Sequence, residues 1–111
     1  GGRFRTSHDV HFRRGRRSVG GKTAVELGAR LAKLAQSAQV IVVTHLPQVA
    51  SWADEQYVVA KGEMDDGSIA TTINQVRGEA RVHEIARMLS GSESEASLEH
   101  AEELLKSSVL D

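Results

Sequence analysis

The sequence predicts an α/β fold with a parallel core strand, an antiparallel hairpin and flanking helices. A helix-period apolar pattern that starts near Thr23 is followed, after a short loop, by the continuous β-branched run 40–43. Two further strand-like runs, 56–61 and about 68–76, enclose a turn-forming Asp-Asp-Gly. Helix, short loop and buried strand in this order are typical of α/β domains.

The N-terminal residues differ in kind from the rest. Residues 1–22 carry seven Lys or Arg residues and one Asp, whereas residues 23–111 carry seven basic and fourteen acidic residues. They show neither a helical nor a strand period. We therefore expect residues 1–17 to be a disordered or aberrant basic segment and 18–111 to form one domain. His8 and His11 lie three residues apart with no evident third ligand, so we expect no metal site.

The first helix is expected to be capped by Thr23, with Glu26 completing a capping box. Its apolar stripe comprises Ala24, Leu27, Leu31 and Leu34. The run 40–43 is apolar on both faces, which is typical of a buried parallel strand. Pro47 suits the first turn of a short helix after that strand.

Two helices are expected to end the chain. The first spans about 79–89 and stops at Ser90 and Gly91, and its inward residues are Val82, Ile85, Ala86 and Leu89. Ser92 and Glu95 form a second capping box. The helix that they open has the inward residues Leu98, Ala101, Leu104 and Leu105.

The composition limits the classes of function. With 111 residues and 40% hydrophobic content, the chain is long enough for one small domain. It has no Cys, which excludes disulfides and thiolate metal sites and agrees with a cytoplasmic location. No apolar run approaches the roughly 20 residues of a membrane helix, so we expect no membrane partner. The first residue is not Met, which suggests a piece of a longer protein.

His45 is the strongest single candidate for a functional residue. It follows the buried strand, and ligands of open α/β sheets bind beyond the carboxyl ends of the strands. An imidazole there could reach a phosphate, or it could simply cap the strand by bonding backbone groups. A P-loop at Gly20-Gly21-Lys22-Thr23 is excluded, because its first Gly would have to stand where the chain has Arg16.

Four stretches of the chain, 19–28, 40–50, 81–91 and 100–105, resemble the RecN family of SMC-like DNA repair ATPases. The likeness covers about residues 18–106 and implies the C-terminal part of an ABC/SMC-type P-loop ATPase head. It makes His45 the switch histidine (the H-loop), which contacts the γ-phosphate. The D-loop region, which meets a second ATPase head, would comprise Ser18, Val19, Gly20, Gly21 and Lys22.

The resemblance also implies cofactors and partners. Members of the family use ATP and Mg²⁺ and act on DNA in the recombinational repair of double-strand breaks, in the cytoplasm at the nucleoid. This chain contains neither a Walker A motif nor a signature motif. Where the family has the Walker B carboxylates, the chain has basic residues at 13–17. We therefore expect this fragment alone to bind neither ATP nor Mg²⁺ and to be inactive.

A frameshift would explain the basic segment. Plausible codons for Asp-Glu-Val-Asp, read one base early, give Arg-Arg-Gly-Arg, which is the sequence at 13–16. The reading frame would be restored near Ser18. Two other functions stay open: a small basic nucleic-acid-binding module, and a module that docks on a complete SMC-like head.

Overall fold

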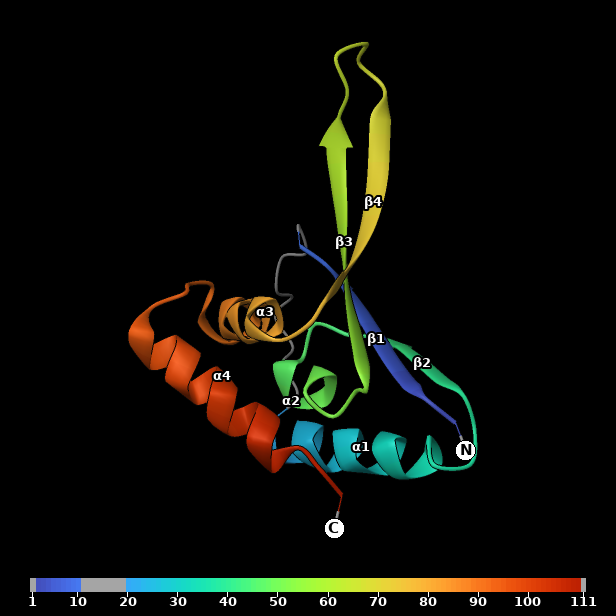
Figure 1. The fold of residues 1–111 in the computed structure, drawn as a ribbon, viewed down its shortest axis with the longest axis vertical. Helices are drawn as coiled ribbons and strands as arrows, with labels where there is room; N and C mark the ends of the chain where they lie inside the picture. Colours follow the sequence, from blue (N-terminus) through green and yellow to red (C-terminus); the bar gives the residue numbers. More distant parts are fainter. Residues whose placement is uncertain (1, 11–19, 111) are drawn as a thin grey trace.

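The computed structural model describes residues 2–10 and 20–110, which form a four-stranded mixed sheet and four helices (Figure 1). The sheet order is β2-β1-β3-β4, in which β1 is parallel to β2 and to β3, and β3 and β4 form an antiparallel hairpin. This arrangement confirms the predicted α/β class with its hairpin. In chain order the elements are β1 (Phe4–Asp9), α1 (Gly21–Leu34), β2 (Val40–Val43), α2 (Pro47–Ala50), β3 (Glu55–Glu63), β4 (Ile69–Val76), α3 (Glu79–Ser90) and α4 (Glu95–Ser107).

Strand β1 lies in the segment that was expected to be disordered, so that prediction is wrong for residues 4–9. The strand is central, because it pairs with both β2 and β3. Phe4, Thr6 and His8 are buried on one face, and the residues between them are less buried. Two of these three inward residues are polar, so no apolar period of two was visible in the sequence. Residues 11–17 lie outside the described residues.

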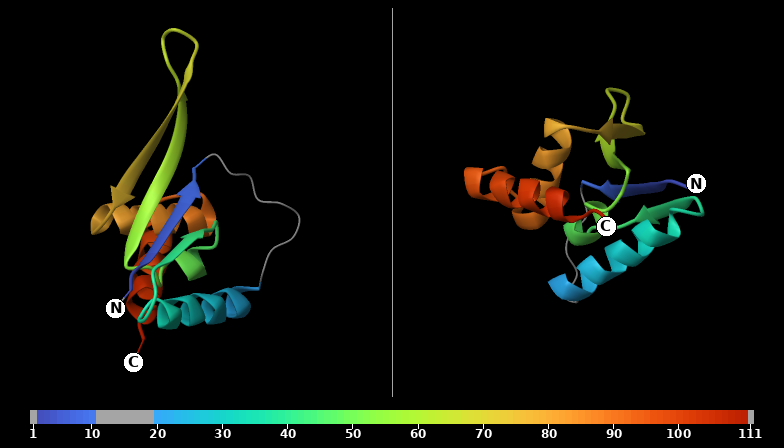
Figure 2. Two further views of the ribbon diagram at one scale, coloured as in Figure 1. Left: turned by 90° about the vertical axis from the view of Figure 1, so that its right-hand side faces the viewer. Right: turned by 60° about the horizontal axis from the view of Figure 1, so that its bottom comes forward.

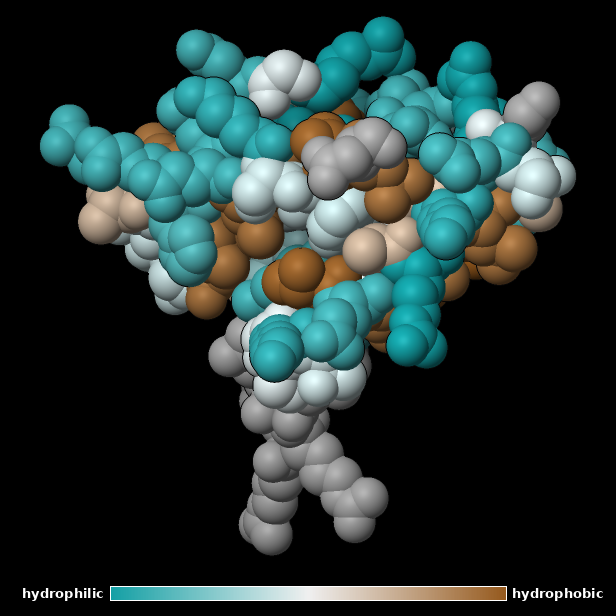
Figure 3. All heavy atoms as spheres, turned by 90° about the horizontal axis from the view of Figure 1, so that it is seen from below, coloured by the Kyte–Doolittle hydropathy of each residue, from teal (hydrophilic) through white to brown (hydrophobic). Residues whose placement is uncertain are grey.

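Strand β2 is an edge strand, and the prediction that it is buried on both faces is wrong. Val40 is buried, but the side chains of Ile41 and Val43 are 71% and 73% exposed. The helices lie on one side of the sheet, and no described element covers the other side (Figure 2). Apolar side chains also reach the surface at the end of the body away from the hairpin tip (Figure 3).

The helical side contains two apolar clusters that share α2. Val49 packs with Phe4 and Val40 beneath the sheet, whereas Ala50 packs with Ile85 of α3 and Ala101 of α4. Pro47 occupies the first turn of α2, as predicted. Because adjacent residues of one short helix enter both clusters, α2 joins the α1 layer to the α3–α4 pair.

Helix α1 differs from its prediction at its start and on its buried face. The helix begins at Gly21, and its N-cap residue is Gly20, which forms no side-chain cap hydrogen bond. The predicted capping box of Thr23 and Glu26 is therefore wrong. Ala24 is buried, and Gly28 lies against the Trp52 ring. Two members of the predicted stripe, Leu27 and Leu34, are instead 44% and 53% exposed.

Helix α3 directs two charged side chains, Arg81 and Glu84, and the thioether of Met88 toward the sheet. Arg81 Nε donates to Oε1 of the fully buried Gln56 over 3.0 Å. The amide of Gln56 donates to Met88 Sδ at 3.7 Å. His8 Nε2 lies 2.8 Å from Glu84 Oε2, and both residues are buried. We call these contacts the α3–sheet seam.

The guanidinium of Arg81 also links α3 to α2. Its Nη2 atom donates to the carbonyl oxygens of Ala50 and Ala53, at 3.0 and 2.8 Å. Carbonyls at a helix C-terminus lack partners within the helix, so a cation there satisfies them. Arg81 therefore holds three elements together: α2, α3 and β3.

The connection between the last two helices confirms one predicted signal and corrects another. Gly91 ends α3 with a φ of 76°, a left-handed conformation that favours glycine. The N-cap of α4 is Ser94, whose hydroxyl accepts from Ser97 N–H, so the expected capping box at Ser92 is wrong. The predicted inward residues of α4 do pack against Ile85 and Ala86.

The β3–β4 hairpin projects well beyond the body (Figure 1). Its turn is built by Asp66, whose carboxylate accepts from the Ser68 N–H and hydroxyl, and by Gly67 at a φ of 86°. Those hydrogen bonds keep the pKa of Asp66 below its ordinary value. The tip is therefore an ordered, acidic turn.

We expect Gly28→Ala to destabilise the protein. A Cβ at this position would lie 2.3 Å from Trp52 Cδ1 and 3.0 Å from the Gln48 carbonyl oxygen. A contact of 2.3 Å places the cost in the upper part of the about 1–3 kcal/mol of overpacking, above the roughly 1 kcal/mol that Ala gains over Gly in a helix. Gly21→Ala on the same helix is the control, because its Cβ would meet nothing within 4 Å. Urea unfolding that shows equal effects of the two changes would contradict this packing.

We expect Glu84→Ala to lower the free energy of unfolding by about 2–3 kcal/mol, since it leaves His8 buried without its partner. Glu93→Ala is the matched control: Glu93 also pairs with a histidine, His83 at 2.6 Å, but both side chains are 44% exposed. That pair should contribute less than about 1 kcal/mol. Urea titrations of both variants measure the free energy of unfolding that each pair contributes. Equal losses would rule out a special role for Glu84.

The His8–Glu84 pair predicts that the stability of the fold depends on pH. The hydrogen bond from His8, with help from the charge of Arg87, holds the pKa of Glu84 below its ordinary value of 4.5. The pair therefore stabilises the fold above that pH, and this stability is lost as the pH falls below it. Part of the acid destabilisation should be absent in Glu84→Ala. A wild-type and variant protein that lose stability in parallel below pH 4.5 would contradict the assignment.

Candidate functional site

The carboxyl ends of β1 and β2 open into a cavity of about 500 Å³. The strand side of the cavity consists of Asp9 and Val10 after β1, and of His45 after β2. The opposite wall is the C-terminal half of α3 and the turn that follows it. The cavity thus lies where ligands of parallel sheets bind, at the end of the strands and beside a helix.

Local structure fixes His45 at this point. The Thr44 N–H donates to the Ser7 carbonyl at 3.0 Å, which keeps β2 paired with β1 up to the residue before His45. The Thr44 hydroxyl oxygen then accepts from Leu46 N–H at 3.1 Å, and Pro47 starts α2. A threonine turn and a proline helix start therefore hold His45 between the strand and the helix.

The surroundings of His45 favour its neutral form. Burial lowers the pKa of His45, and the nearby His8 lowers it further, while Asp9 acts in the opposite direction. A neutral imidazole has one N–H donor and one acceptor nitrogen. It can therefore bond a ligand oxygen through its N–H without bringing a permanent positive charge into the cavity.

Positive charge at the cavity comes from Arg87 of α3. Its side chain is 48% exposed, and its Nη2 lies 3.1 Å from Glu84 Oε1. Glu84 is thereby held between Arg87 and His8, since its other oxygen meets His8. Arg87 and His45, on opposite walls, are two hydrogen-bond donors for an anionic ligand group, in a lining that also carries the carboxylates of Asp9 and Glu84.

Sequence reasoning missed His8, Glu84 and Arg87. Glu84 lies on the side of α3 away from its predicted apolar stripe, and we assigned no role to that side from the sequence. The available signal was the spacing of Arg81, Glu84 and Met88, three and four residues apart, which defines a second face of the helix. That face needed a polar strand opposite it, and β1 had not been recognised.

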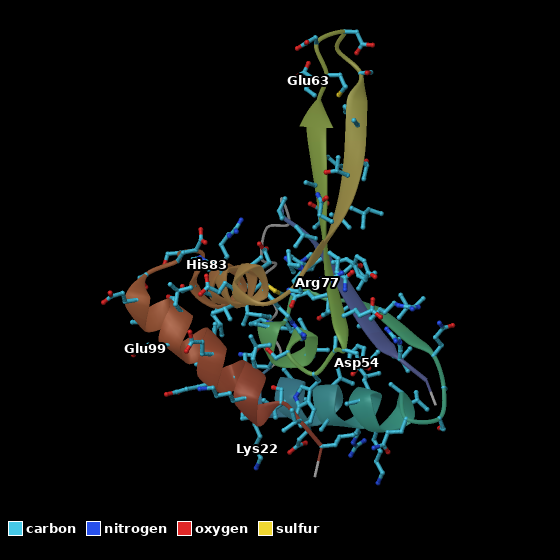
Figure 4. All side chains as sticks on the ribbon, in the orientation of Figure 1. Lys22, Asp54, Glu63, Arg77, His83 and Glu99 are labelled. Carbon is cyan, nitrogen blue, oxygen red and sulfur yellow. The ribbon has the colours of Figure 1, made fainter. Side chains whose placement is uncertain are left out.

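The predicted D-loop residues are placed only in part. Ser18 and Val19 lie outside the described residues. Gly20 precedes α1, and Gly21 and Lys22 form its exposed first residues. None of these three lines the cavity at His45, and Lys22 lies on the helical body, far from the hairpin tip at Glu63 (Figure 4). The structure therefore does not bring Gly20, Gly21 and Lys22 together with His45.

Two kinds of feature, a metal-binding cluster and a membrane-spanning helix, are absent from the described residues. Residues 2–10 and 20–110 contain no group of three or more His, Cys, Asp or Glu side chains that could hold a metal ion. Asp9 and Glu84, the two carboxylates of the cavity lining, are not part of such a group. Within the same residues, no helix is both long and apolar enough to cross a membrane.

Comparison with known proteins adds a clear relationship. The chain is 56% identical over 95 residues to the DNA repair protein RecN of Streptomyces coelicolor, an alignment that covers 84% of this chain and 16% of the relative. It is 49% identical over 94 residues to RecN of Mycobacterium leprae, with the same coverage. RecN of Deinococcus radiodurans is 47% identical over 87 residues, which cover 78% of this chain and 15% of that protein.

No protein-family model matches the chain. The chain spans about a sixth of the length of these curated relatives, although most of its own residues align with them. The resemblance that residues 19–28, 40–50, 81–91 and 100–105 indicated is thus confirmed over most of the sequence. The chain belongs to the RecN family of DNA repair proteins and corresponds to a part of them.

Proposed function

We propose that this chain supplies the switch-histidine corner of a nucleotide-binding ATPase head, and that it serves DNA repair only together with the rest of such a head. The observation that carries the proposal is the position of His45. Its imidazole stands at the carboxyl ends of two parallel strands and lines an open cavity whose opposite wall carries Arg87. A γ-phosphate oxygen is a ligand of the right charge and hydrogen-bonding type for this pair of groups.

The open edge of β2 supports the dependence on further protein. Ile41 and Val43 are more than two-thirds exposed on an uncharged strand whose outer edge is unpaired among the described residues. An open strand edge is normally paired, and an exposed apolar face is normally covered. In the proposed complex, the remainder of the head pairs with this edge and supplies the Walker A and signature motifs. ATP, Mg²⁺, DNA and a second head are then ligands and partners of the assembly.

The nucleic-acid-binding alternative has less support from the described residues. Arg3 and Arg5 of the basic segment both face Glu55, with nitrogen–oxygen distances of 2.6 and 3.5 Å. Their charges are therefore partly neutralised within the chain. The arginines at 13–17 lie outside the described residues. Binding to DNA that weakens steeply with salt would favour this alternative.

The decisive experiment measures ATP binding by the chain alone and by the chain co-expressed with the remaining part of the Streptomyces coelicolor relative. We expect neither binding nor hydrolysis by the chain alone. In the complex, His45→Ala should weaken ATP binding about tenfold or more, because a hydrogen bond to a charged group contributes about 1.5–3 kcal/mol.

His100→Ala is the matched control, since His100 is an exposed residue of α4 away from the cavity. It should leave ATP affinity unchanged. Equal affinity of the wild-type and His45→Ala complexes would exclude the proposed role of His45. Turnover by the isolated chain that His45→Ala abolishes would show that the remainder of a head is not needed.

A further inference from the structure

The second edge of the sheet, strand β4, has the features of a pairing surface. Its eight residues contain no charged side chain and no proline. Natural edge strands are usually protected from pairing by charge, by proline or by short length. On its uncovered face, Ile69 and Ile73 are 72% and 65% exposed. The edge belongs to the projecting hairpin, so another chain can approach it without meeting the helices (Figure 1).

The hydrogen bonding of the hairpin fixes which β4 residues have free backbone groups. The Met64 N–H donates to the Ser68 carbonyl, so these two residues form a hydrogen-bonded pair. The register continues from this pair along the hairpin to Gln56, which lies opposite Val76. Antiparallel ladders alternate, so the even-numbered residues of β4 bond β3. The N–H and C=O groups of the odd-numbered residues therefore point outward, at the edge where a further strand would bind. These residues are Ile69, Thr71, Ile73 and Gln75.

We propose that two copies of this chain pair through β4, antiparallel and with Thr71 on the twofold axis. Thr71 then lies opposite Thr71 of the second copy, and Ile69, Thr71 and Ile73 all meet outward-pointing residues. Gln75 lies beyond this paired stretch, opposite the turn. Ile69 of each copy lies opposite Ile73 of the other, on the same face of the joined sheet. Apolar cross-strand pairs of this kind stabilise antiparallel sheets.

Charge complementarity supports a second copy as the partner. In this register the acidic hairpin tip of each copy, with Asp65 in its turn, approaches the hairpin base of the other copy, where Arg77 follows β4. Figure 4 shows the two ends that meet, with Glu63 at the tip and Arg77 at the base. Within its own chain Arg77 donates to Gln75 Oε1 at 2.8 Å and forms no ion pair with a described residue. The twofold axis creates this acidic–basic contact twice.

The pairing is independent of the proposed nucleotide site. It uses β4, whereas the head remainder would use β2, at the opposite edge of the sheet. Because one strand from each copy makes the contact, the interface is small and the dimer should be weak and dependent on concentration. Evidence against the β4 pairing would leave the proposed role of His45 unaffected. Evidence against the role of His45 would likewise leave the β4 pairing unaffected.

Disulfide trapping tests the register. The chain has no cysteine, so Thr71→Cys introduces a single thiol. Residues opposite each other in a hydrogen-bonded antiparallel pair have Cα atoms about 5.5 Å apart, which suits a disulfide. We expect Thr71→Cys to form covalent dimers under mild oxidation at least tenfold faster than Glu63→Cys. Glu63 is the matched control, because it lies at the exposed tip of the same hairpin but far from its counterpart across the axis.

Charge reversal tests the ends of the interface. Asp65→Arg and Arg77→Asp should each weaken self-association in sedimentation experiments, and the double variant should restore it. Glu99→Arg makes the same charge change as Asp65→Arg on the outer face of α4 and should have no effect (Figure 4). Circular dichroism checks that each variant is folded. A wild-type chain that stays monomeric at all concentrations, or equal trapping of Thr71→Cys and Glu63→Cys, would overturn the proposal.

Discussion

The rest of the structure depends on the seam of buried polar contacts between α3 and the sheet. The inward face of the sheet presents His8 and Gln56 at the level of α3. Buried polar groups are costly unless they are bonded. Glu84 bonds His8, and Arg81 bonds both Gln56 and the carbonyls that end α2. An apolar helix in the place of α3 would leave all of these groups without partners.

The seam also builds the candidate site. Glu84 holds His8 with one carboxylate oxygen and Arg87 with the other. One carboxylate therefore fixes both the position of α3 beside β1 and the guanidinium at the cavity. The wall opposite His45 consists of the same helix. The stability of the fold and the shape of the cavity are thus consequences of the same contacts, and a change at Glu84 acts on both.

The two edges of the sheet differ in what they offer to a partner. β2 is four residues long, lies against the body and leads directly to His45. β4 is eight residues long and belongs to a hairpin that projects from the body (Figure 1). A strand added at β2 would extend the sheet beside the candidate site, whereas one added at β4 would leave the site untouched. The two edges can therefore be occupied at the same time.

The sequence by itself determined the elements whose signals are local. Pro47 marks the start of α2, Gly91 the end of α3, and Asp66 with Gly67 the turn of the hairpin. It also placed His45 after a strand, which the structure confirms. In each case the residue acts on its own backbone or on that of its immediate neighbours.

Only the tertiary structure decided which faces are buried and which side chains surround His45. The run 40–43 is equally apolar in a central and in an edge strand, so its composition could not reveal its place in the sheet. β1 has a polar inward face, and its two strand partners lie more than thirty residues away in the chain. Glu84 becomes a core residue only because His8, 76 positions earlier, lies opposite it. Such pairings form between distant segments, and no local pattern in either segment contains them.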